Sequence, residues 1–534
     1  MLILQDLQYT LPSKELLFAN INLSLDKRDK IALIGNNGSG KSTLLKIIAG
    51  HLQPSRGQVI SECHPYYLPQ IFGQYDHLTL AAALGIEDKL RAFYRILDGD
   101  GTEYDLEVLN DDWTIEERCR AALNFWKIEG LDLRQPLGTL SGGEKTKVFL
   151  AGISIQQPEL ILLDEPSNHL DAAGRALLHE FIKQPASTLI VVSHDRKLLN
   201  LLPRMVELTQ CQLKVYGGDY NFYAAKKQLE LEALNLEVQS KERALRKSRE
   251  KESEIMERKQ KLDARGQKKQ EKAGVSRIMM NTLRNKAENS TSKINNVQAE
   301  KISKLTQSLQ HLRAALPDID RMKFAFQDSN LHSGKVLYTV KDLNQHHNQQ
   351  YLWASNLDFE IRSGERLALA GANGSGKTTL IKALTGVLQP SSGSIYRCDH
   401  SFVYIDQDYS LIDTSLTVFE QAEHFNRELA EHEIKIRLNR FLFTKADWAK
   451  PCNGLSGGER MRLILCCLTI RSQAPDLIVL DEPTNNLDIQ NTDILAAAIN
   501  SYQGTLIVIS HDEEFLQQIN IQRQIELKAA GGLT

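Results

Sequence analysis

Hydrophobic residues follow two different patterns along this chain of 534 residues. In the outer parts they gather in short unbroken runs, such as LILLD at 160–164 and LIVLD at 477–481, which predict fully buried strands. From residue 220 to about 316 they become sparse and recur at heptad-like spacing, at Leu229, Leu236, Ile302, Leu305, Leu309 and Leu312. This middle segment has no proline, two glycines and mostly strong helix formers, so we predict an antiparallel α-helical hairpin there.

The two outer parts repeat one another in four ordered blocks. The first block is KIALIGNNGSGKSTLLKIIAG at 30–50, which returns as RLALAGANGSGKTTLIKALTG at 366–386. The others are LSGGEKTKVFLAG (140–152) and LSGGERMRLILCC (455–467), LILLDEPSNHLD (160–171) and LIVLDEPTNNLD (477–488), and TLIVVSHD (188–195) and TLIVISHD (505–512). Ordered repetition of this kind indicates a duplicated α/β domain of roughly 220 residues. We therefore expect a first domain at 1–222, a helical linker at 223–318 and a second domain at 319–534.

The two copies differ in length at one place. The first copy is 21 residues longer than the second between Gln70 and Ser141. Residues 85–113 are the expected insertion, and their pattern predicts a short helix followed by an acidic loop rich in Gly and Asp.

Composition narrows the class of protein. The chain is 42% hydrophobic and 25% charged, which is ordinary for a soluble globular protein. Its seven cysteines form no CxxC pair, which argues against a zinc or iron–sulfur framework, and the odd number suits a reducing compartment. We find no signal-peptide pattern at the N-terminus and no apolar run near the ~18–20 residues of a membrane span. We therefore expect a soluble, cytoplasmic protein.

Charge is distributed unevenly along the chain. The net charge is −3, but residues 226–313 hold 22 Lys and Arg against 12 Asp and Glu. The basic excess concentrates at 258–293, the expected tip of the hairpin. A basic finger on an otherwise acidic body predicts contact with RNA phosphates through one element only.

Each copy carries a glycine-rich phosphate-binding loop. GNNGSGKS at 35–42 and GANGSGKT at 371–378 follow apolar strands and open helices, which is the context a P-loop requires. Glycines let backbone N–H groups wrap the phosphates of ATP, and the helix N-terminus attracts the anion. The expected ATP-binding residues here are Gly35, Asn36, Asn37, Gly38, Ser39, Gly40, Lys41, Ser42 and Thr43, and Gly371, Ala372, Asn373, Gly374, Ser375, Gly376, Lys377, Thr378 and Thr379.

Polar residues at the ends of later strands predict the hydrolytic chemistry. Aspartates that end apolar runs are expected on the Mg²⁺ side, and the glutamates that follow them can polarise an attacking water as general bases. The predicted Mg²⁺ residues are Ser42, Gln70 and Asp164, and Thr378, Gln407 and Asp481. The predicted catalytic residues are Glu165 and His194, and Glu482 and His511.

The LSGGE block, present twice, resembles the signature of the ATP-binding cassette superfamily. In that family two cassettes lie head to tail and share each ATP, so the resemblance implies two hydrolytic sites. The first nucleotide site would use the P-loop at 35–42 with Gln70, Asp164, Glu165 and His194, capped by Ser456, Gly457, Gly458 and Glu459. The second nucleotide site would use the P-loop at 371–378 with Gln407, Asp481, Glu482 and His511, capped by Ser141, Gly142, Gly143 and Glu144. Tyr9 and His347 are candidates for contacting adenine.

Two cassettes around a helical linker, with the blocks DEPSNHLD and DEPTNNLD, resemble the ABC-F family more closely. YGGDYNFYAAKK at 216–227 is similar to that family's entry into its linker. The resemblance implies a functional monomer that binds the ribosome at the tRNA exit site. It also implies that the linker tip contacts peptidyl-tRNA near the peptidyl-transferase region, either in a housekeeping role or in protection against antibiotics.

Two other classes of function remain open on the sequence alone. A cytosolic ATPase could serve a transporter through a separate membrane protein, because fused cassettes need not carry their own membrane domain. A DNA-maintenance ATPase also joins cassette halves to coiled coils, although its coiled coils are usually much longer.

Overall fold

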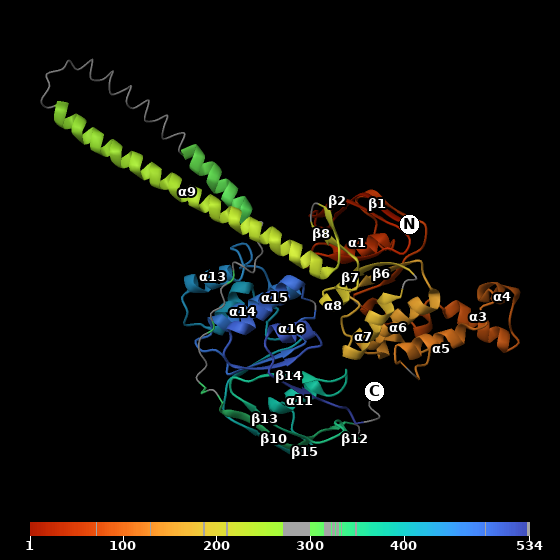
Figure 1. Cartoon of the computed structure of the whole chain (residues 1–534). Coiled ribbons are helices and arrows are strands. Elements are labelled where there is room, and N and C mark those ends of the chain that lie inside the picture. The colour runs from red at the N-terminus through yellow and green to blue at the C-terminus, as the bar shows by residue number, and fades with distance from the viewer. Residues whose placement is uncertain are drawn as a thin grey trace. The chain divides into compact units, whose positions relative to one another are not determined.

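The computed structural model describes residues 1–70, 72–128, 130–184, 187–209, 212–270, 299–313, 322, 326, 331–332, 334–347, 350–485 and 487–530. The chain divides into two compact units (Figure 1). One unit comprises Met1–Asn221 with Met322–Thr534, and the other is Phe222–Arg321. The domain boundaries at 222 and 318 stay predictions.

The first copy folds around a mostly parallel six-stranded sheet in the order β5-β6-β7-β3-β8-β9. Among the described strands of this sheet, only β8 and β9 pair in an antiparallel manner. These strands are β3 (Lys30–Ile34), β5 (Tyr66–Leu68), β6 (Leu160–Asp164), β7 (Thr188–Val192), β8 (Arg204–Leu208) and β9 (Leu213–Gly217). A second sheet in the order β2-β1-β4 contains β1 (Leu2–Thr10), β2 (Leu16–Leu25) and β4 (Arg56–Ser61). The helices are α1 (Lys41–Ile48), α2 (Leu80–Ala83), α3 (Glu87–Leu97), α4 (Glu103–Leu109), α5 (Ile115–Phe125), α6 (Gly142–Gln156), α7 (Ala172–Lys183) and α8 (Arg196–Leu199).

The second copy repeats this plan with a parallel five-stranded sheet in the order β16-β17-β18-β14-β19. Its strands are β14 (Arg366–Ala370), β16 (Phe402–Ile405), β17 (Leu477–Asp481), β18 (Thr505–Ile509) and β19 (Arg523–Glu526). The remaining strands are β10 (Val336–Asn344), β11 (His346–His347), β12 (Gln350–Tyr351), β13 (Leu357–Arg362) and β15 (Ser392–Arg397). The helices are α11 (Lys377–Leu384), α12 (Val418–Phe425), α13 (Glu431–Arg440), α14 (Gly457–Ile470), α15 (Ile489–Ser501) and α16 (Glu513–Gln518). The predicted α/β fold with two nucleotide-binding domains is confirmed.

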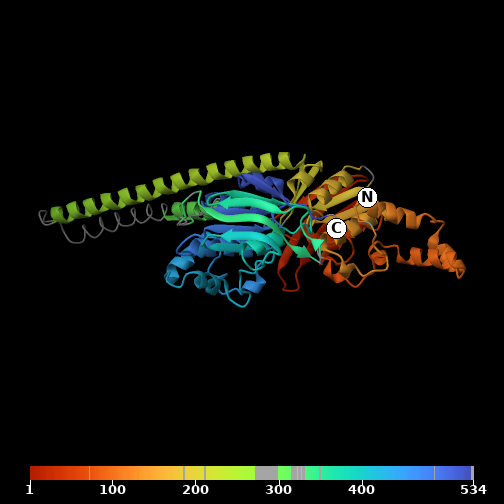
Figure 2. The same ribbon diagram turned by 90° about the horizontal axis from the view of Figure 1, so that it is seen from below.

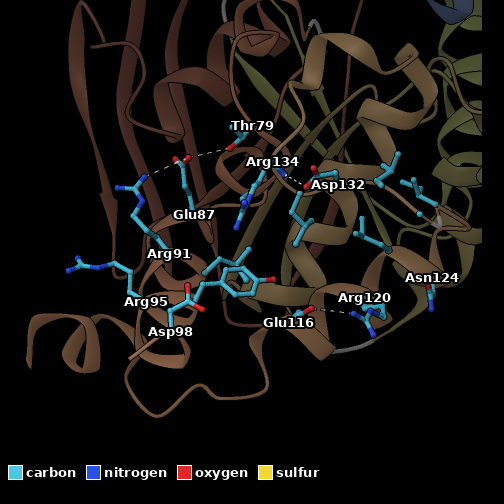
Figure 3. A pocket seen from close by; sticks show the side chains of 18 residues that line it. Thr79, Glu87, Arg91, Arg95, Asp98, Glu116, Arg120, Asn124, Asp132 and Arg134 are labelled. Carbon is cyan, nitrogen blue, oxygen red and sulfur yellow. Dashed lines mark hydrogen bonds and ion pairs between the residues drawn. The ribbon is translucent and has the colours of Figure 1, made fainter. Parts of the chain in front are cut away.

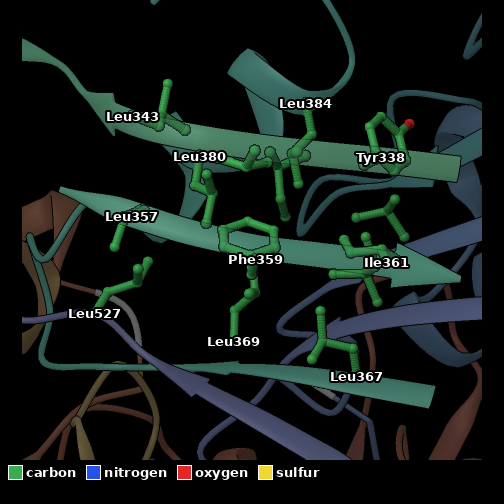
Figure 4. Packing of buried hydrophobic residues seen from close by; sticks show 14 of the residues in the cluster. Tyr338, Leu343, Leu357, Phe359, Ile361, Leu367, Leu369, Leu380, Leu384 and Leu527 are labelled. Atoms are coloured by element: carbon green, nitrogen blue, oxygen red, sulfur yellow. The ribbon is translucent and has the colours of Figure 1, made fainter. Parts of the chain in front are cut away.

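The core of each copy lies where its antiparallel sheet packs on the P-loop helix and the parallel sheet. Strand β13 shows the alternation that this position requires, because Leu357, Phe359 and Ile361 are buried while the intervening residues are exposed. Figure 4 shows Phe359 between Leu380 of α11 and Leu369 of β14. Burying one such side chain stabilises the fold by roughly 1.5–3 kcal/mol, so this packing holds the P-loop helix firmly in place.

The insertion of the first copy is more regular than its sequence predicts. Helix α3 occupies the predicted helical part, but the expected acidic loop contains a second helix, α4. The reason is a capping box, in which Thr102 Oγ1 accepts from Asp105 N and Asp105 Oδ2 accepts from Thr102 N at 2.8 Å. The prediction that the second part of the insertion is an acidic loop is therefore wrong where α4 forms.

Helices α3 and α5 and the loop at 130–134 line a cavity of about 900 Å³ (Figure 3). Arginines project around it, but acidic neighbours accompany them. Arg91 lies 3.8 Å from Glu87, and Arg120 lies 3.2 Å from Glu116. The cavity therefore has no strong preference for an anion.

The second unit is built on one long helix, α9 (Tyr220–Gln270), of 51 residues. At 1.5 Å per residue this helix is roughly 75 Å long. Residues 299–313 are also helical and lie beside it in Figures 1 and 2. Val238 and Leu309 are buried, and Arg313 donates to Glu242 at 2.5 Å, so the two segments pair as the hairpin prediction requires. Most of the predicted basic tip, residues 271–293, lies outside the described residues.

Among the described residues, none of the helices combines the length and apolar character that crossing a bilayer requires.

Candidate nucleotide-binding sites

Both P-loops have the backbone shape that a phosphate cradle needs. Gly38 and Gly40 adopt φ values of 80° and 96°, which side-chain-bearing residues rarely reach. A Cβ atom at Gly40 would also lie 2.8 Å from the Phe18 ring, so glycine is required there. Gly374 and Gly376 repeat this geometry with φ values of 77° and 88°. Each loop then opens a helix, α1 or α11, whose first residue is the P-loop lysine.

The lysines fold back over their own loops. Lys41 Nζ donates to Gly35 O at 2.7 Å and Asn36 O at 3.1 Å. Lys377 Nζ makes the same pair of bonds at 2.7 and 3.0 Å. Burial lowers the pKa of both ammonium groups, and a bound phosphate would offset that loss of solvation. The buried Oγ atoms of Ser39 and Ser375 have no hydrogen-bond partner among the described residues, so each loop fits an acceptor such as a phosphate.

A hydroxyl and a carboxylate already meet beside each P-loop. Ser42 Oγ donates to Asp164 Oδ1 at 3.0 Å, and Thr378 Oγ1 donates to Asp481 Oδ2 at 3.2 Å. Burial raises the pKa of both aspartates. Oxygen pairs of this type suit Mg²⁺, which would restore the negative charge of the buried carboxylates. Gln70 and Gln407 follow the edge strands β5 and β16, which pair in parallel with the strands that end at these aspartates.

Two tyrosines join these aspartates and were missed by the sequence analysis. Tyr67 OH donates to Asp164 Oδ2 at 3.2 Å, and Tyr404 OH donates to Asp481 Oδ2 at 2.8 Å. A signal existed in the repeat, because each tyrosine stands three residues before the glutamine of its copy, in YLPQ and YIDQ. At the first site the tyrosine and the P-loop hydroxyl donate to different oxygens of Asp164, whereas at the second site both donate to Oδ2 of Asp481.

The predicted bases Glu165 and Glu482 are buried at the end of the strand and adopt strained backbone conformations. Their φ values are 52° and 48°, in the left-handed region that costs a non-glycine residue of order 1 kcal/mol or more. His194 Nε2 lies 3.3 Å from Glu165 Oε1, and His511 Nε2 lies 3.5 Å from Glu482 Oε1. In both cassettes the carboxylate of this strained residue therefore lies beside the predicted histidine.

Burial controls protonation in these pairs. It raises the pKa of Glu165 to about 8 and that of Glu482 to about 7. Burial, followed by the charge of the P-loop lysine, lowers the pKa of His194 to about 3 and that of His511 to about 4. Both imidazoles are therefore neutral near pH 7, and both carboxylates hold protons more tightly than an exposed glutamate, which suits general bases.

The LSGGE blocks form helix N-termini. Ser141 caps α6 and Ser456 caps α14, each in a capping box with the glutamate three residues later. Glu144 Oε2 and Glu459 Oε2 accept from the backbone N–H of the serine at 2.8 Å. The two glycines keep side chains away from the helix start, where free N–H groups favour an anion.

The two cassette copies touch at the P-loops. Asn373 Nδ2 donates to His169 O at 2.9 Å, and a Cβ atom on Gly143 would lie 3.3 Å from Asn373 Nδ2. The first signature block therefore lies at the second P-loop, as the head-to-tail arrangement predicts. In the reverse direction Asn37 N donates to Asp488 Oδ2 at 2.8 Å. The capping of the first nucleotide site by Ser456, Gly457 and Gly458 stays a prediction.

Ion pairs add to this contact. Arg196 of α8 donates to Asp493 of α15 at 2.5 Å and lies 3.7 Å from Glu514 of α16. Lys197 pairs with Glu513. These charges belong to different copies, so they stabilise the pairing of the two P-loop domains.

The adenine candidates receive no support. Tyr9 packs on Phe18, with ring centroids 6.2 Å apart. The side chain of His347 lies outside the described residues.

Comparison with known proteins agrees with this geometry. The family model described as ABC transporter matches residues 18–168 and 354–485. The protein YdiF of Bacillus subtilis (strain 168) is 31% identical over 546 residues, covering 96% of this chain and 77% of that protein. ABC transporter F family member 5 of Arabidopsis thaliana is 27% identical over 541 residues, covering 95% of this chain and 72% of that protein. The chain belongs to the ABC-F family of ATP-binding cassette proteins.

Solved structures share the fold of this ABC-F chain. The archaeal ribosome recycling factor aABCE1, in its complex with the ribosomal stalk protein aP1, superposes with a TM-score of 0.60 at 19% identity. The match covers 97% of this chain and 86% of that chain. An ABC-F chain with two such cassettes binds ATP and is an ATPase.

Proposed function

We propose that this protein is an ATP-hydrolysing translation factor that binds the ribosome at the tRNA exit site. ATP closes the two cassettes, and the closed form fits the ribosome. The linker tip then contacts peptidyl-tRNA and RNA near the peptidyl-transferase region, and hydrolysis releases the factor. Protection of the ribosome against antibiotics that bind in this region is one form that this activity takes.

The observation that carries the proposal is the second unit of the molecule. Helix α9 runs for 51 residues, and the segment from 226 to 313 has ten more basic than acidic residues. A long, basic, two-helix element suits a narrow cavity walled by RNA phosphates. The fold also resembles that of a protein named as a ribosome recycling factor, which supports the same class of partner.

At each nucleotide site, separate residues would bind the phosphates, close the site and accept the proton. Lys41 and Lys377 hold the β/γ-phosphates, and the serines of the signature blocks close the sites from the opposite cassette. Glu165 and Glu482 accept a proton from the attacking water. A bound Mg²⁺, held by Ser42 and Asp164 or by Thr378 and Asp481, would neutralise phosphate charge.

Coupling between ATP and ribosome follows from linkage. If the ribosome binds the ATP-closed form better than the open form, ATP and ribosome must favour each other's binding by the same factor. Slowing hydrolysis therefore traps the factor on ribosomes.

The test uses the Glu165→Gln, Glu482→Gln double variant in the full chain. With ATP this variant should cosediment with ribosomes, whereas the wild type should be found mostly in the free fraction. The matched control deletes residues 258–293 in the same background. This deletion variant should no longer cosediment with ribosomes. Sedimentation of the double variant free of ribosomes, or its recovery with membranes or DNA instead, would contradict the proposal.

A second measurement separates the two roles. Expression of the wild-type chain in a sensitive strain, scored against drugs that bind the peptidyl-transferase region, should raise resistance if protection is its role. Unchanged sensitivity across the panel would leave the chain as a housekeeping factor and contradict the protective role.

A further inference from the structure

The two residues that follow the SHD block carry opposite charges in the two cassettes. In the first cassette they are Arg196 and Lys197, at the start of α8. In the second cassette they are Glu513 and Glu514, at the start of α16. Both helices begin directly after the aspartate of the repeated block, which caps them, so these are equivalent positions of the repeat. The duplication thus keeps the capping residue and reverses the sign of the two residues after it.

These opposite charges meet where the cassettes pair. Lys197 forms an ion pair with Glu513, and Arg196 Nε lies 3.7 Å from Glu514 Oε2. The contacts are reciprocal, because the first residue after the SHD block of each cassette contacts the second residue after that block in the other. A two-fold interface between equal partners has this property, in which position i meets position j and j meets i. The two cassettes therefore pair here through the same face.

A third acidic residue of the second cassette joins this contact. Asp493 of α15 accepts from Arg196 Nη2 at 2.5 Å. Its equivalent in the first cassette, five residues after the capping aspartate of α7, is the uncharged Ala176. The Arg196 side chain is only 19% exposed, so solvent and salt screen its ion pairs less than those of a fully exposed side chain. The basic side of the contact thus belongs to the first cassette and the acidic side to the second.

Pairing of two like cassettes would turn these attractions into repulsions. Because the interface is reciprocal, two first cassettes from different chains would place Arg196 of each against Lys197 of the other. Two second cassettes would place Glu513 of each against Glu514 of the other. Like charges in direct contact suppress a wrong partner even where the remaining surfaces match. The P-loops and signature blocks do match, because each cassette carries a complete set of both.

We propose that the basic face of α8 and the acidic face of α15 and α16 select which cassettes pair, so that a first cassette accepts a second cassette and rejects its own kind. The partner that fits the basic face is therefore the second cassette of the same chain, and a further copy of the first cassette is repelled. Turnover depends on this pairing, because Gly143 of the first signature block lies at the second P-loop. The inference does not require the ribosome as a partner, so it stands apart from the proposed role in translation.

The experiment reverses the charges of one side at a time in the full chain. Arg196→Glu with Lys197→Glu makes both sides acidic, which is the combination that two second cassettes would present. Asp493→Arg with Glu513→Lys places basic residues opposite basic residues, as two first cassettes would. Each double variant should raise KM for ATP roughly tenfold with a smaller loss of kcat, because ATP binding must then also drive a disfavoured pairing.

Combining all four substitutions exchanges the charges and should return KM most of the way to the wild-type value. This recovery separates charge pairing from misfolding, since independent losses of stability would add instead of cancelling. It also excludes the contact of Arg196 with the Tyr220 ring, whose centroid lies 6.0 Å from the guanidinium carbon, because the combined variant still lacks that contact. The outcome therefore depends on the opposite signs alone.

Lys27→Glu with Arg56→Glu is the matched control for net charge. Both residues are exposed and form ion pairs within the first cassette, with Glu159 and Asp6, so this variant should keep the wild-type KM. Unchanged KM values in both reversed variants would overturn the inference. A combined variant as impaired as the reversed variants would overturn it as well, because these residues would then matter for something other than their opposite charges.

Discussion

At the first nucleotide site Asp488 of the opposite cassette holds Asn37 N at 2.8 Å, while at the second site Asp171 lies 3.5 Å from Asn373 N. The second site has a further bond across the cassettes, from Asn373 Nδ2 to His169 O. Its lysine also lies 3.4 Å from His511 Nε2. The two sites thus have matching motifs but different neighbours from the opposite cassette.

The difference teaches that a shared motif does not make two sites chemically equal. The residues within each motif come from one cassette, and their spacing fixes their mutual geometry. The residues that tune them come from the other cassette and are free to diverge. Burial raises the pKa of Glu165 to about 8 and that of Glu482 to about 7.

The strongest test of this inequality removes one base at a time. Each glutamate-to-glutamine change should lower turnover at its own site by ~10²–10⁴-fold, since a general base contributes that much. Because the two P-loops make different contacts with the opposite cassette, Glu165→Gln and Glu482→Gln should remove unequal shares of total phosphate release. Glu159→Gln, an exposed glutamate near Lys27, is the matched control. Equal shares lost from the two single variants would show that the sites are equivalent.

The contacts across the cassettes give the next largest effect. Asp488→Ala removes the cap of α15 and the bond to Asn37 N, so it should cost ~2 kcal/mol and raise KM at the first site. Asp171→Ala removes the cap of α7, but its contact with Asn373 N is long at 3.5 Å. This variant should therefore lose less stability than Asp488→Ala. Asp512→Ala, which removes the cap of α16, controls for capping alone. Thermal unfolding measures the loss of stability, and site-resolved KM values measure the loss of ATP affinity. A larger effect from Asp171→Ala than from Asp488→Ala would show that the second site depends more on its contact across the cassettes.

Most of the fold can be predicted from the sequence, and so can the residues that a single cassette contributes to each nucleotide site. Runs such as LILLD place Asp164 and Glu165 at the end of a buried strand. The sequence repeat predicts the same placement for Asp481 and Glu482 in the second cassette. The P-loop shape follows from its glycines, because φ values near 80–96° leave little alternative.

What could not be predicted depends on contacts between distant residues. His169 and Asn373 are 204 residues apart, and nothing in either block indicates that they meet. The short helix α4 was missed for a different reason, because Thr102 and Asp105 serve equally well in a turn or a cap.

A smaller effect should distinguish the two tyrosines. Tyr404→Phe removes a 2.8 Å bond to Asp481, and Tyr67→Phe removes a 3.2 Å bond to Asp164. Hydrogen bonds to charged groups contribute ~1.5 kcal/mol or more, so each change should raise the Mg²⁺ concentration needed for half-maximal turnover by roughly tenfold. We expect the larger shift from Tyr404→Phe, measured by Mg²⁺ titration of ATPase activity in the single-glutamine backgrounds. Tyr104→Phe, on the exposed face of α4, is the control.

The insertion is the other difference between the cassettes, and it should have the smallest effect on catalysis. Thr102→Ala removes one half of the capping box that holds α4, which should lower Tm by about 2–4 °C. Turnover at both sites should stay within the error of the assay, because neither α3 nor α4 contributes a predicted site residue. Thr139→Ala, which removes a hydroxyl from a turn, is the matched control. If Thr102→Ala instead changed the ratio of turnover between the sites, the insertion would share in their inequality, and the neighbours of each P-loop would no longer explain it alone.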